Sequence, residues 1–145
     1  MRNAHIDTTM DLEGHAVVLA VFDVTHAESS AAAHVVAVVR AERYRNAELS
    51  SDDVLAMREL TALADELGDL VGRGGAGTLV LRAGRLTVMR DALEAFVTER
   101  DDADWIRDED REPLAAVRAL LWPLGDLATE ALRAALAAAS PTTAQ

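Results

Sequence analysis

The sequence predicts a single α+β domain, residues 1–145, in which three main helices pack on a small sheet of two or three strands. Three observations support this class. The last third of the chain carries a long helical pattern, the first third carries short runs of β-branched residues, and half of the 145 residues are apolar, which is enough for one sizeable core. The predicted order is two strands, a helix, a strand and two helices.

The first strand is predicted at residues 16–24, where AVVLAVFDV is rich in β-branched residues and apolar on both alternating faces. A second run, HVVAVV, predicts a strand at 34–44 that a hairpin joins to the first. The competing interpretation is a helix from Ser29 or Ser30 onward, because three consecutive alanines favour helix. We expect residues 1–13 and 140–145 to be loose termini.

The middle of the chain predicts helix, strand and helix at 51–71, 78–81 and 83–100. Ser50 or Ser51 can cap the first helix, and the glycines of 72–77 end it. Both helices have an apolar face at intervals of three and four residues, formed by Ala56, Leu60, Leu63, Leu67 and Leu70 in one and by Leu86, Met89, Leu93 and Phe96 in the other. A hairpin pairing 79–81 with 86–88 is the alternative to the second helix.

The longest helix is predicted at 111–139 and would span about 40 Å. Asp108 or Asp110 can cap it, Pro113 fits a first turn, and Pro123 should bend the axis without ending the helix. Its apolar side is predicted to consist of Leu114, Val117, Leu121, Leu124, Ala128, Ala131 and Ala135.

The composition disfavours several classes of function. The chain has no cysteine and no lysine, and its formal charge of −11 opposes binding to nucleic acid or to an anionic membrane. The start of the chain lacks a secretory signal pattern, and the apolar run 16–22 is too short to span a membrane. We therefore expect a cytoplasmic protein that binds neither nucleic acid nor membrane.

Motifs for catalysis are weak. The glycines of 72–77 run from a helix toward a strand and lack the Gly-Lys-Ser/Thr ending of a phosphate loop. No serine lies in a nucleophile motif. The run 99–112 holds eight acids and three arginines but fails the calcium-loop pattern, so it predicts a solvated face or a docking surface for a basic partner.

Two small groups are weak ligand-binding candidates. If the predicted hairpin forms, His26, Glu28 and His34 gather at its tip and could bind a metal, although solvated loop histidines are the commoner outcome. The arginines Arg40, Arg43 and Arg45 could bind a carboxylate or phosphate, although ion pairing within the fold is favoured. We expect no cofactor.

Trp122 lies on the charged side of the last helix, together with Arg118, Asp126, Thr129 and Arg133. Another part of the chain could cover this indole, such as the turn with Trp105 and Ile106, or the bend at Pro123 could rotate it inward. The alternative is that it anchors an interface. The interface candidates are Trp122, Trp105, Leu124, Ala128, Ala131 and Ala135.

The sequence thus predicts a small acidic protein that acts by protein–protein interaction and forms a homodimer, rather than an enzyme. The alternative is a small-molecule-binding protein or enzyme with a site between the sheet and the helices, built from the histidines and from Arg40, Arg43 and Arg45.

Overall fold

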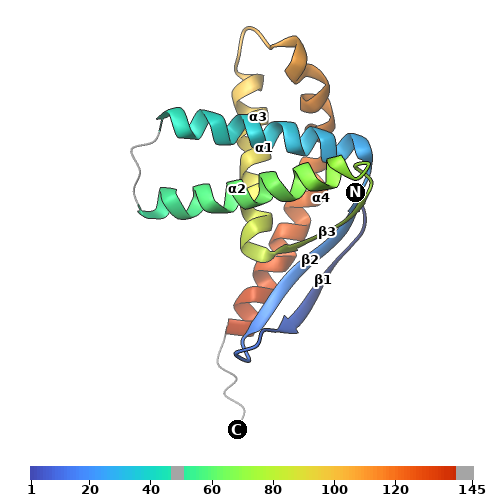
Figure 1. Ribbon diagram of the computed structural model, residues 1–145, viewed down its shortest axis with the longest axis vertical. Helices are drawn as coiled ribbons and strands as arrows, with labels where there is room; N and C mark the ends of the chain where they lie inside the picture. Colours follow the sequence, from blue (N-terminus) through green and yellow to red (C-terminus); the bar gives the residue numbers. More distant parts are fainter. Residues whose placement is uncertain (47–50, 140–145) are drawn as a thin grey trace.

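The structure is a computed structural model that describes residues 1–46 and 51–139 (Figure 1). Its elements are β1 (Arg2–Met10), β2 (Ala16–Val24), α1 (His26–Asn46), α2 (Ser51–Gly72), β3 (Gly77–Arg82), α3 (Ala83–Asp101) and α4 (Asp108–Ala139). The predicted α+β class is confirmed. The described residues form four helices instead of three, because residues 34–44 are helical.

The prediction of a strand at 34–44 is wrong, and the competing helix interpretation holds. Helix α1 starts with a capping box, in which the Glu28 backbone N–H donates to Thr25 Oγ1 at 3.2 Å and the Thr25 N–H donates to Glu28 Oε1 at 2.9 Å. The valines then fall on one side of the helix. The buried residues of α1 are Ser29, Ala31, Ala32, Val35, Val36 and Val39.

The prediction that residues 1–13 are loose is also wrong, since β1 pairs antiparallel with β2. The connecting turn is held by Asp11, whose Oδ1 accepts the backbone N–H groups of Glu13 at 2.9 Å and His15 at 2.8 Å. Almost every β1 side chain is exposed, so no apolar alternation marks this strand in the sequence. Backbone pairing on β2 orders it. Residues 140–145 lie outside the described part of the chain.

The sheet has the order β1-β2-β3, with antiparallel pairing throughout. The inner face of β2 is buried through Val18, Ala20, Phe22 and Val24, and β3 adds Leu79 and Leu81 to the same face. Figure 1 shows the long α4 running behind the strands and α1 beside α2 above them. The opposite, outer face of the sheet has half-buried Val17, Leu19 and Val21 beside the more exposed Val80.

Helices α2 and α3 and strand β3 agree with the predictions at 51–71, 83–100 and 78–81, and the alternative hairpin is excluded because a helix starts at Ala83. Their predicted leucines, Met89 and Phe96 are buried in one continuous core. Among the described residues, no helix is long and apolar enough to cross a membrane.

Helix α4 is continuous through Pro123, as predicted. It begins at Asp108, so Pro113 lies beyond the first turn and not within it. Most of the predicted apolar side is buried, but Leu121 and Ala135 are half-buried, and Leu120 and Leu127 are in the core as well. The buried residues of α4 are Asp110, Leu114, Val117, Leu120, Leu124, Leu127, Ala128 and Ala131.

Candidate functional site

An open cleft of about 630 Å³ lies where α1, the end of α3, the connection 102–107 and the start of α4 meet. Apolar side chains line one part of it, including Val38, Ile106 and the exposed Trp105. Charged side chains line the other part. The cleft is therefore surrounded by helices and does not lie between the sheet and the helices, where the sequence placed a small-molecule site.

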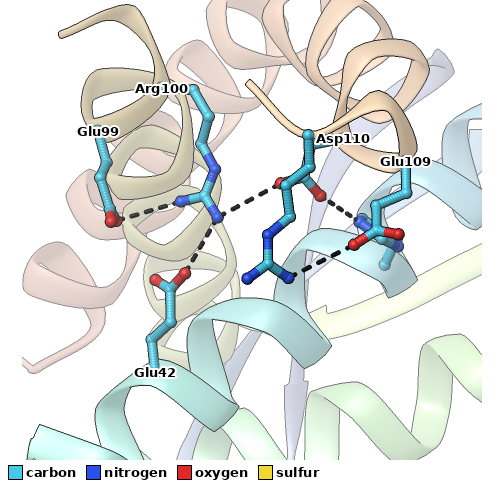
Figure 2. Close-up of polar contacts among 7 residues, drawn as sticks. Glu42, Glu99, Arg100, Glu109 and Asp110 are labelled. Atoms are coloured by element: carbon cyan, nitrogen blue, oxygen red, sulfur yellow. Dashed lines mark hydrogen bonds and ion pairs between the residues drawn. The ribbon is translucent and has the colours of Figure 1, made fainter. Parts of the chain in front are cut away.

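Asp110 is the centre of the charged part, and only 4% of its surface is exposed. Its Oδ1 lies 2.8 Å from His34 Nε2 on α1, and its Oδ2 lies 3.6 Å from Arg100 Nη2 on α3. Figure 2 shows this carboxylate facing Arg100. A buried carboxylate is costly unless it is paired, so the two contacts explain why an acid is tolerated here.

Arg100 connects several acids. Its Nη2 donates to Glu42 Oε1 on α1 at 3.0 Å, and its Nη1 lies 3.2 Å from Glu99 Oε2 (Figure 2). The guanidinium carbon is 4.0 Å from the centre of the Phe96 ring, which is a cation–π contact. Within the described residues, the buried Nη1 makes no contact with hydrogen-bond geometry, and its contact with Glu99 is an ion pair only.

The rim of the cleft carries exposed charges of both signs, with Arg107 Nη1 3.4 Å from Glu109 Oε1. Among the residues that the structure describes, no serine, threonine or cysteine lines the cleft. A histidine held by a carboxylate can move a proton, but the described lining of the cleft contains no hydroxyl or thiol for it to activate.

The predicted metal group is not assembled. His26 Nδ1 lies 3.0 Å from the carbonyl oxygen of Gly74, Glu28 pairs with the N-terminal ammonium of Met1, and His34 contacts Asp110. The three side chains thus have separate partners, because they lie on a helix and not at a hairpin tip. Among the described residues, only Asp11, Glu13 and His15 bring three donor atoms together, and all three are exposed.

The arginines Arg40, Arg43 and Arg45 are not gathered around one point. Arg40 Nε donates to Thr61 Oγ1 on α2 at 3.0 Å, and its guanidinium carbon is 5.4 Å from the centre of the Tyr44 ring. Arg45 lines the cleft, on a different side of α1, and Arg43 is half-buried. Side chains five residues apart on a helix point about 140° away from each other around its axis, so Arg40 and Arg45 cannot share a ligand.

The interface candidates divide into two groups. Leu124, Ala128 and Ala131 are buried in the chain's own core, so they cannot form an interface, and Ala135 is half-buried. By contrast, Trp105 is 73% exposed and Trp122 is 80% exposed. The interpretation that the Trp105 turn covers Trp122 is therefore wrong.

Two further apolar residues, Leu132 and Leu136, are 55% and 62% exposed on the same side of α4 as Trp122. We call this set the outer stripe; it consists of Trp122, Gly125, Thr129, Leu132 and Leu136. The sequence pattern predicted that Trp122 lies on this side, whereas neither leucine was predicted there. Their spacing to Trp122 is the signal that could have found them.

Comparison of the chain with protein-family models, with curated proteins and with solved structures finds no match in any of the three.

Proposed function

We propose that this protein acts through protein–protein interaction and forms a homodimer. The observation that carries the proposal is the outer stripe, where a tryptophan and two leucines are exposed on one side of the longest helix. The core beneath is already closed by the other side of α4, so these side chains are not needed to complete the fold. Grouped exposed apolar residues of this kind mark interaction surfaces.

The proposal includes a cytoplasmic location and partners that are neither nucleic acid nor membrane. The formal charge of −11 supports both, because a large net charge favours solubility and an acidic protein repels anionic polymers.

Light scattering coupled to gel filtration tests the homodimer. The monomer has a mass of 15.5 kDa, and we expect about twice this mass at micromolar concentration and a decrease on dilution. A mass of one chain at every concentration up to the millimolar range would contradict self-association.

A second candidate function is binding of a small ligand in the cleft, and it is favoured by the buried Arg100 Nη1, whose ion pair with Glu99 at 3.2 Å does not have hydrogen-bond geometry. Glu42, Glu99 and Asp110 already surround this guanidinium, so a further anion would be repelled. A neutral carbonyl group is the acceptor that fits, and the exposed Trp105 ring can stack on an aromatic group beside it.

Fluorescence of Trp105 in a Trp122→Phe variant tests this candidate with nicotinamide, a neutral aromatic amide, as the probe. We expect the quenching to saturate as the probe concentration rises. His34→Ala, which changes a residue of the cleft, should weaken binding of the probe. Leu55→Ala, a control far from Trp105, should leave it unchanged. Quenching that increases linearly with probe concentration would show collision and no site.

A further inference from the structure

The outer stripe has the spacing of a helix-pairing seam. Its five residues follow one another at steps of three, four, three and four, so they stay on one side of α4 for about 21 Å. Large side chains stand at its two ends, Trp122 at one and Leu132 with Leu136 at the other.

The middle of the stripe is small. A Cβ added to Gly125 would meet no atom within 4 Å, which shows that the space above it is open. Thr129 Oγ1 donates to the Gly125 carbonyl oxygen at 3.0 Å, so its hydroxyl already has an acceptor within the helix. A second helix could therefore approach closely here without leaving that hydroxyl unpaired.

The stripe is nearly symmetric about Thr129, because Trp122 precedes it by seven residues and Leu136 follows it by seven. In a two-fold dimer with antiparallel helices centred on Thr129, Trp122 of each copy meets Leu136 of the other. The tryptophan end of each stripe then packs against the leucine end of the other.

The charges beside the stripe fit the same arrangement. Asp126 and Arg133 are exposed on one edge of it, three residues before and four residues after Thr129. Antiparallel pairing sets Asp126 of each copy beside Arg133 of the other, which gives two ion pairs. Parallel two-fold pairing would instead place this edge of the two copies on opposite sides of the contact, so these ion pairs would not form.

We propose that the occupant of the outer stripe is the same stripe of a second copy, with the two α4 helices antiparallel and crossing at Thr129. This inference rests on the proposed self-association and adds its surface and its geometry. A contact confined to one helical side is smaller than a standard interface of about 1,600 Å². The dimer should therefore dissociate on dilution.

Charge exchange on the full-length chain tests the geometry. Asp126→Arg and Arg133→Asp should each weaken dimerisation about tenfold, since each replaces two attractions by two repulsions. The double variant D126R/R133D should restore the affinity, because the pairs form again with their signs exchanged. Sedimentation equilibrium measures the dissociation constants, and Leu55→Ala, on the exposed side of α2, is the control for a general loss of apolar surface.

Trp122 gives an independent readout. In a Trp105→Phe background, the emission of Trp122 should shift to the red on dilution, as the indole becomes exposed to water. Trp122→Ala should leave the monomer folded, as measured by circular dichroism, while it weakens the dimer more than Leu55→Ala does.

The outcomes separate the two proposals. A wild-type protein that is monomeric throughout would overturn both. If the wild-type protein dimerises and Asp126→Arg, Arg133→Asp and Trp122→Ala all dimerise with the same affinity, the α4 geometry alone is overturned. Weaker dimerisation of Leu19→Arg or Val80→Arg would then place the contact on the outer face of the sheet. A double variant as weak as the single ones would also overturn the antiparallel arrangement.

Discussion

Arg100 is the residue on which the charged part of the cleft depends, because its guanidinium faces Glu42, Glu99 and the buried Asp110. We expect Arg100→Met to lower the free energy of unfolding by about 3 kcal/mol, since it leaves buried carboxylate charge without its cation. Urea denaturation measures the change.

Arg118→Met is the matched control for Arg100→Met. Arg118 pairs with Asp101, but both side chains are about half exposed, so its loss should cost less than about 1 kcal/mol. Equal effects of the two substitutions would show that Asp110 does not require Arg100.

Asp23 joins the three strands on the outer face of the sheet. Its carboxylate accepts hydrogen bonds from Thr78 Oγ1 on β3 at 2.6 Å and from Asn3 Nδ2 on β1 at 2.8 Å. The hydrogen bond from Thr78, followed by that from Asn3, holds the pKa of Asp23 below its usual 3.8. A lowered pKa in the folded state means that the ionised group stabilises the fold above pH 3.8, and this contribution is lost as the pH falls through the folded pKa.

We expect Thr78→Val to raise the pKa of Asp23 toward 3.8, because the hydroxyl donor is removed. An NMR titration of the Asp23 carboxyl carbon measures it. Thr9→Val changes a threonine at the far end of β1 and should leave this pKa as it is. A pKa of Asp23 that does not move in Thr78→Val would contradict the assigned cause.

At the scale of elements, the connection from α2 to β3 depends on backbone conformation. Gly75 has a φ of +81°, and its carbonyl oxygen accepts from Ser29 Oγ at 2.6 Å, which ties the connection to α1. An added Cβ would lie 2.3 Å from His26 Nδ1. Both the left-handed backbone and the contact with His26 require glycine here.

Two glycine substitutions should therefore have opposite effects. Gly75→Ala should lower the free energy of unfolding by about 1–3 kcal/mol because of strain. Gly68→Ala, on the exposed side of α2 with no atom near its added Cβ, should raise it by about 0.5–1 kcal/mol through helix propensity. Thermal melts compare the two, and a stabilising Gly75→Ala would show that this turn is free to change.

At the scale of the whole molecule, one core extends from β2 through all four described helices. We expect a single cooperative transition in calorimetry, with an unfolding enthalpy of roughly 100 kcal/mol per chain near 60 °C. Agreement between the calorimetric and van 't Hoff enthalpies, after allowance for dimer dissociation, is the check. Two resolved transitions would mean that the sheet and the helices unfold as separate units.

Local pattern in the sequence was sufficient for the elements that bury a regular apolar face. It predicted α2, β3, α3, β2 and the continuous α4, because burial at intervals of two or of three and four residues leaves a direct trace in the order of residues. It also separated Trp122 from the buried side of α4, where the structure leaves the indole exposed.

Tertiary structure decided what local pattern could not. The run HVVAVV in α1 is rich in β-branched valine, yet it is helical. The Thr25–Glu28 capping box and the burial of Val35 and Val36 stabilise this helix. The capping residues could be seen in the sequence, but the burial could not. Strand β1 has no apolar alternation and exists because β2 offers it a backbone edge. The contact of His34 and Arg100 with Asp110 joins residues 76 and 10 positions apart in the chain, and only the packing of α1, α3 and α4 brings these charges together.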